Sequence, residues 1–131
     1  MTSLYDLTIP VLTRVLRTEE HLLKKAEEYS KSTGTPIEEL LTARLAPDMF
    51  SLSKQVGITV YFARTAAHLL AGSELVPTEL GEWSLEENYS NIAQALKSLA
   101  DIKPEAVNGK ELDTVSFSVG PRKTTQKAID W

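Results

Sequence analysis

The feature that most constrains the fold is a run of apolar residues spaced alternately four and three positions apart. This spacing places them on one side of an α-helix, where they form the seam of a helical bundle. Ser84 precedes the run and Glu87 stands three positions later, which is the pattern of a capping box at a helix start. The sequence therefore predicts a bundle helix over residues 84–102. Its apolar seam consists of Leu85, Tyr89, Ile92, Leu96 and Leu99.

Helical periodicity also runs through most of the chain before this segment. Pro10 interrupts the first helix, which either kinks there or begins near Thr8, and we expect the kink. Residues 35–38, TPIE, combine a capping threonine, a proline at the first helical position and a reciprocal glutamate. Gly72 is a natural helix terminator. Two long helices and one short helix are therefore predicted, over residues 3–30, 48–71 and 36–45 respectively.

The period changes to two after Pro104. Val115, Phe117 and Val119 alternate with serines, and the pair Gly120-Pro121 supplies a turn, so a β-hairpin is predicted over residues 113–128. A length of 131 residues suits one domain covering residues 1–131. We expect a mainly all-α, up-down helical bundle with three long helices, one short helix and a C-terminal β-hairpin.

Composition excludes several classes of function. The net charge of -4 and the scattered basic residues give no electrostatic surface for nucleic acid. No apolar run approaches the ~20 residues of a membrane span, and the first ten residues lack the pattern of a secretory signal. The absence of cysteine excludes thiolate catalysis and cysteine-ligated metals. We expect a cytoplasmic protein with no cofactor and with neither a nucleic-acid nor a membrane partner.

The chain has only two histidines, His21 and His68. On a helical wheel both lie across from the apolar side of their helices, whereas a bundle metal site needs several inward ligands. The sequence therefore predicts no metal site. An alternative is a cluster of His68 with Arg64 and Tyr61 at the edge of a cleft, because one helical turn brings these side chains together.

Four polar residues fall inside predicted apolar stripes: Thr8 and Glu19 in the first helix, and Gln55 and Thr59 in the second long helix. A polar group without a partner would be unfavourable there. Two interpretations remain open. The first is an internal hydrogen-bond network, or a glutamate near a helix-end opening. The second is a polar patch in an apolar pocket, in which Glu19 has a raised pKa and acts as an acid or base. The candidate pocket residues are Thr8, Gln55 and Thr59, together with Phe62 from the apolar arc of the second long helix.

Two stretches are more specific than the rest of the chain: SLYDLTIPVL at residues 3–12 and ARLAPDMF at residues 43–50. Together they resemble an uncharacterised fungal and bacterial family of the DinB/YfiT-like superfamily of helical bundles. The resemblance implies a four-helix bundle with a short helix before the second long one. Within the superfamily it also implies a three-histidine metal site and, in some branches, transferase or hydrolase activity.

This chain departs from the superfamily in two ways. No histidine follows His68, so the implied metal site does not carry over, and the sequence stops at Trp131, where the family's final helix would begin. Arg44 and Asp48 stand in the second motif. They form either a buried ion pair that fixes the chain reversal, or a site in which Arg44 binds a substrate carboxylate.

The leading functional hypothesis is a metal-free helical-bundle module that binds a small apolar molecule or a protein partner between its helices. The alternative is a DinB-like enzyme, a transferase or hydrolase, with candidate catalytic residues Glu19, Arg44, Asp48 and His68. Because a bundle without its final helix leaves an apolar groove, we also expect a homodimer. It would form through the second and third long helices, or by exchange of the hairpin with Trp131 near the contact.

Overall fold

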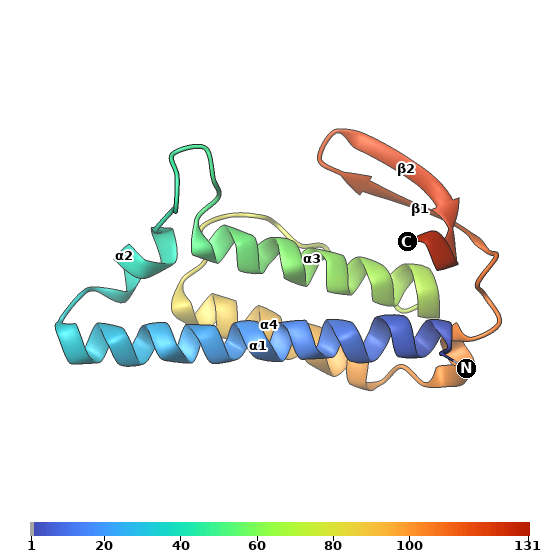
Figure 1. The fold of residues 1–131 in the computed structure, drawn as a ribbon, viewed down its shortest axis with the longest axis horizontal. Helices are drawn as coiled ribbons and strands as arrows, with labels where there is room; N and C mark the ends of the chain where they lie inside the picture. The colour runs from blue at the N-terminus through green and yellow to red at the C-terminus, as the bar shows by residue number, and fades with distance from the viewer. Residues whose placement is uncertain (1) are drawn as a thin grey trace.

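The computed structural model describes residues 2–131 and shows a bundle of three long helices with a short helix at one end and a β-hairpin at the other (Figure 1). The predicted fold class is confirmed, and two short elements, α5 and η1, were not predicted. The elements are α1 Leu4–Thr33, α2 Ile37–Thr42, α3 Leu52–Ala71, α4 Leu85–Ala100, α5 Pro104–Val107, β1 Thr114–Val119, β2 Arg122–Lys127 and the 3-10 turn η1 Ala128–Asp130.

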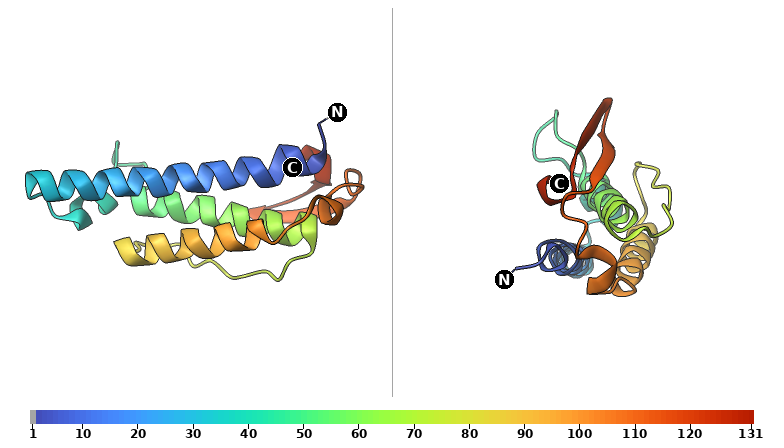
Figure 2. Two further views of the ribbon diagram at one scale, coloured as in Figure 1. Left: turned by 90° about the horizontal axis from the view of Figure 1, so that it is seen from below. Right: turned by 90° about the vertical axis from the view of Figure 1, so that its right-hand side faces the viewer.

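The helix α1 runs along the whole length of the molecule, and α3 and α4 pack beside it. Seen end-on, the three helices form a triangle, and the hairpin stands outside it against α3 (Figure 2). The two ends of the chain lie at the same end of the bundle. No helix within residues 2–131 combines the length and the apolar character needed to cross a lipid bilayer.

The helix boundaries follow local capping chemistry. Ser3 and Asp6 form a capping box at the start of α1, which continues through Pro10 and ends at the left-handed Gly34 (φ 73°). Ser84 and Glu87 form the predicted box at the start of α4. Helix α3 begins at Leu52 rather than near residue 48 and, as predicted, ends at Gly72.

The predicted short helix is shorter than expected. Helix α2 covers residues 37–42 instead of 36–45, and no side chain caps its first turn. Thr35 bonds to Thr33 instead of capping the helix. Beyond α2, the backbone N–H of Leu52 donates to the carbonyl oxygen of Ala43 (3.1 Å), so residues 44–51 form a closed loop that projects from the bundle (Figure 1).

The core lies between α1, α3 and α4. The predicted seam of α4 faces this core: Ile92 and Leu99 are buried, and Leu85, Tyr89 and Leu96 are half-buried. Helix α1 has two neighbouring apolar stripes, and the one packed against α3 and α4 contains Leu16 and Leu23, each with 0% exposure. The buried core side chains of the three helices are Leu4, Ile9, Leu16, Leu23, Val56, Val60, Ala63, Ala66, Ala67, Leu70, Ile92, Ala95 and Leu99.

The other stripe of α1 is exposed. Its large apolar side chains, each about half accessible to solvent, are Leu7, Val11, Val15, Leu22 and Tyr29. Within residues 2–131, α3 and α4 carry no comparably exposed large apolar side chain. The expectation that the second and third long helices present the apolar face is therefore wrong, because α1 and the 73–84 segment cover those helices.

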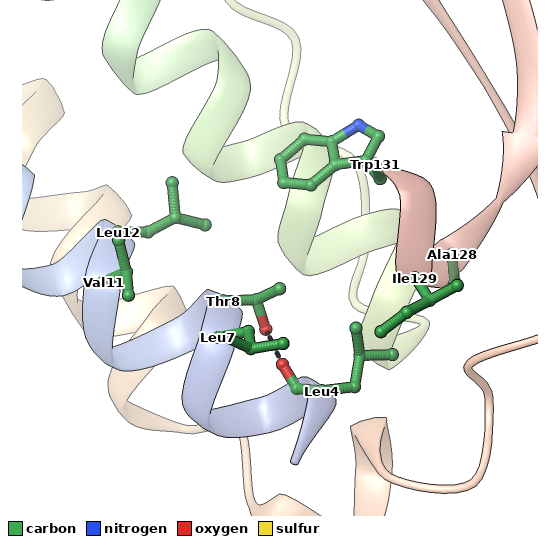
Figure 3. A pocket seen from close by; sticks show the side chains of 8 residues that line it. All are labelled: Leu4, Leu7, Thr8, Val11, Leu12, Ala128, Ile129 and Trp131. Atoms are coloured by element: carbon green, nitrogen blue, oxygen red, sulfur yellow. Dashed lines mark hydrogen bonds between the residues drawn. The ribbon is translucent and has the colours of Figure 1, made fainter. Parts of the chain in front are cut away.

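The hairpin pairs β1 with β2 in antiparallel register, with Val119 opposite Arg122 across the turn. Val115 is buried, and the ring of Phe117 contacts Trp131 edge to face, with 6.1 Å between centroids. Trp131 and Ile129 lie opposite the first turns of α1 across a groove of about 290 Å³ (Figure 3). The C-terminal residues therefore lie near only the N-terminal part of the exposed α1 stripe.

Candidate functional site

An apolar pocket lies between α3, the loop before it, the 73–84 segment and the hairpin turn. We call it the hairpin pocket. Helix α3 supplies side chains at spacings of four, three and one, which place them on one face of the helix. The cavity volume is about 330 Å³, and its lining residues are Phe50, Lys54, Ile58, Tyr61, Phe62, Leu80, Val119 and Gly120.

Contacts between distant segments hold this pocket in shape. The hydroxyl of Tyr61 donates a hydrogen bond to the carbonyl oxygen of Ser118 (3.0 Å), which fixes the hairpin turn over α3. The rings of Tyr61 and Phe62 meet edge to face at 5.4 Å. On the other side, the side chain of Leu80 lies against Gly57, where an added Cβ would be 3.4 Å away.

One lining residue of the hairpin pocket, Lys54, is charged. The Lys54 ammonium lies 4.6 Å from the centre of the Phe50 ring, within cation–π range. Among residues 2–131, no carboxylate lies within 4.0 Å of Lys54 Nζ. The only other polar side-chain group of the lining, the Tyr61 hydroxyl, already uses its proton on Ser118.

A second, smaller site surrounds Glu19 between α1 and α3. Glu19 Oε1 accepts a hydrogen bond from Thr59 Oγ1 at 2.7 Å, whereas Glu19 Oε2 is buried without a hydrogen-bond partner. Burial raises the pKa of Glu19 to about 7, although the Thr59 bond acts in the opposite direction. The site is a cavity of about 130 Å³ lined by Glu19, Leu22, Leu23, Leu52, Gln55 and Val56.

Of the four inward polar residues, only three are close together. Gln55 lines the Glu19 cavity, but it is exposed, and its Nε2 donates to the carbonyl oxygen of Phe50 (2.9 Å). Thr8 lies elsewhere: its hydroxyl donates to the carbonyl oxygen of Leu4 (2.8 Å) and faces the C-terminal groove (Figure 3). The predicted polar patch therefore contains Glu19, Gln55 and Thr59 but not Thr8.

Arg44 and Asp48 do not form the expected buried pair. Both are exposed on the projecting 44–51 loop, and no salt bridge joins them within the described part of the chain. The physical reason is that the loop closed by the Ala43–Leu52 backbone bond projects away from the bundle, so nothing covers the two side chains. Arg44 instead borders a surface depression with Leu40 and other apolar residues.

The two histidines are exposed, as predicted. His68 Nδ1 lies 2.9 Å from the carbonyl oxygen of Ser73, and the expected alternative cluster with Arg64 and Tyr61 does not form. Tyr61 bonds to the hairpin, and Arg64 points into the interior. Across residues 2–131, no three His, Cys, Asp or Glu side chains are close enough to hold a metal ion.

Arg64 is the residue that sequence reasoning misplaced most. Arginine side chains usually lie in water, yet Arg64 is only 5% exposed. Its guanidinium donates to three neutral oxygens: Thr78 Oγ1 at 2.9 Å, Asn91 Oδ1 at 3.1 Å and Gln94 Oε1 at 3.3 Å. Burial lowers its pKa. Arg64 belongs to α3. Its bonds therefore link α3 to the 73–84 segment, which lies over this face of the helix, and to α4.

Comparisons with known proteins agree with this architecture. A crystal structure of a DinB family member protein from Shewanella denitrificans superimposes with a TM-score of 0.80, over 97% of this chain and 72% of that one. The two sequences are 24% identical, so this likeness shows a shared fold. No curated protein shows significant similarity to the sequence. The family model described as a domain of unknown function (DUF1993) matches residues 4–130, and the chain therefore belongs to the DUF1993 family, with a DinB-like helical fold.

Proposed function

We propose that this domain binds a small apolar molecule in the hairpin pocket. The observation that carries the proposal is a cavity of about 330 Å³ whose walls come from four separate segments and are almost entirely hydrocarbon. Binding sites for small molecules are typically ~300 to 1,000 Å³, mostly apolar, with a few polar groups. The bonds from Tyr61 to Ser118 and from Arg64 to Thr78 hold two of these walls in place. A preformed site needs little ordering on binding.

The proposal can be tested by filling the pocket. Ile58→Trp places a larger ring in the cavity, and we expect it to weaken binding of the neutral fluorescent probe N-phenyl-1-naphthylamine by at least about tenfold. Leu112→Trp is the matched control, because Leu112 is 72% exposed and does not line the pocket. Native mass spectrometry of the purified parent would show a retained molecule directly. Equal probe binding by parent, Ile58→Trp and Leu112→Trp would contradict the proposal.

A second candidate function is acid–base catalysis of the transferase or hydrolase type at Glu19. It is supported by the free, buried Oε2 and by the pKa of about 7, which lets the carboxyl give or take a proton near neutral pH. The test is a screen with ester and thiol-transfer substrates in which Glu19→Gln serves as the inactive comparison. Activity that is unchanged in Glu19→Gln would exclude this role.

We further propose that two copies associate through the exposed stripe of α1. The support is the row of half-exposed apolar side chains at Leu7, Val11, Val15, Leu22 and Tyr29, which extends well beyond the part facing Trp131. A two-fold arrangement would cover the same stripe on both copies and leave no further surface to pair.

A further inference from the structure

The hairpin pocket contains one charged side chain, that of Lys54. Lys54 is half-buried at the start of α3 and stands against an aromatic ring. The carboxylate of Glu82 lies near this helix start and accepts hydrogen bonds from the hydroxyl of Ser51 at 2.7 and 2.8 Å. It does not reach Lys54 within 4.0 Å. The pocket therefore combines apolar walls with a cation that has no acidic partner among the described residues.

We propose that the ligand of the hairpin pocket is a small apolar carboxylate, with its hydrocarbon part in the cavity and its carboxylate paired with Lys54. This inference rests on the proposed function. An ammonium beside apolar walls interacts more strongly with an anion than it does in bulk water, because the surroundings screen the charges less. A neutral ligand would leave the cation unpaired.

The cavity also limits the size of the ligand. At roughly 30 Å³ for each non-hydrogen atom, as in liquid water, about 330 Å³ holds on the order of ten atoms. A medium-chain carboxylate such as octanoate is of this size. Phe62 and Ile58 would contact its chain, whereas Lys54 would contact its head group.

The experiment compares octanoate with octan-1-ol, which has the same chain length and no charge. Both are titrated at pH 7 by displacement of N-phenyl-1-naphthylamine and by calorimetry. We expect the parent to prefer octanoate by about tenfold, the effect of one hydrogen bond to a charged group. The preference should disappear in Lys54→Met, persist in Lys54→Arg, and be unchanged in the control Lys97→Met on the exposed side of α4. Added salt should reduce it.

The outcomes separate the two proposals. If octanoate and octanol bind the parent equally, or if Lys54→Met keeps the preference, the carboxylate inference is wrong while the apolar pocket stands. If neither compound binds the parent, and Ile58→Trp binds the fluorescent probe as the parent does, the proposed function itself fails. Lys54→Arg keeps the positive charge and serves as the matched variant. If Lys54→Met remains folded and it alone loses the preference for octanoate, the result supports the pairing of Lys54 with the carboxylate.

Discussion

Replacing Glu19 by glutamine should change how the stability of this protein depends on pH. Glu19 Oε1 is held by Thr59, and its other oxygen is buried without a partner. Glutamine has nearly the same shape and still accepts the Thr59 bond, but it does not titrate. The substitution therefore removes a buried ionisable group and leaves its packing against α3 in place.

The sign of the effect follows from proton binding. In the unfolded chain the Glu19 carboxyl ionises near 4.5, whereas in the folded protein its pKa is about 7. Between these values the folded state holds the extra proton, so the free energy of unfolding falls as pH rises. At about 1.4 kcal/mol per pH unit this interval gives about 3.4 kcal/mol, and partial solvent access reduces it to about 2 kcal/mol.

The assay is urea unfolding of parent and Glu19→Gln at several pH values from 4 to 8, followed by circular dichroism. We expect similar stability at pH 4 and a variant more stable than the parent by about 2 kcal/mol at pH 8. Glu28→Gln is the control, because Glu28 is on the same helix but exposed. A difference between Glu19→Gln and parent that stays constant from pH 4 to 8 would refute the reasoning.

Two further predictions concern Arg64 and the α1 stripe. Arg64→Lys keeps a charge but cannot reach all three of its partners, so it should lower the free energy of unfolding by about 2 kcal/mol and speed hydrogen exchange in residues 73–84. The exposed Arg17→Lys should change neither quantity, and a fully stable Arg64→Lys would show that these bonds contribute little. Burying the α1 stripe gains roughly 1 kcal/mol for each side chain, and a two-fold pair buries the stripe of both copies. Light scattering should therefore show twice the 14.5 kDa chain mass, and Leu22→Glu, but not Leu112→Glu, should restore the monomer. A parent that is monomeric at these concentrations would contradict the dimer.

The parts of the fold that the sequence predicted are those set by local interactions. The seam of α4 repeats over four turns and its capping pair lies within three residues, so both could be identified without knowing the rest of the chain. The hairpin was identified for the same reason, because alternation and a Gly-Pro turn are local signals. Its position over α3 depends on Tyr61 and Ser118, which are 57 residues apart.

The errors arise where a distant segment decides which face is buried. Helix α1 has two apolar stripes, and periodicity gives no reason to choose Leu16 and Leu23 over Val15 and Leu22. Arginine is a residue type that usually lies in water, but the 73–84 segment, which has no periodicity, covers Arg64. The Arg44–Asp48 pair was inferred from a motif, and a motif does not show that its two side chains meet.

The two walls of the hairpin pocket are held in place by different kinds of contact. A two-stranded hairpin is only marginally stable by itself, so this one depends on its contacts with the bundle. Those contacts are few: Tyr61 bonds to Ser118, and Val115 is buried. The α3 wall of the pocket is part of the core, whereas the wall formed by Val119 and Gly120 has no core of its own. A ligand that fills the pocket adds contacts to the weaker wall. Ligand binding and docking of the hairpin on α3 must therefore stabilise each other. The free energy by which a bound ligand favours the docked hairpin equals the free energy by which the docked hairpin favours ligand binding.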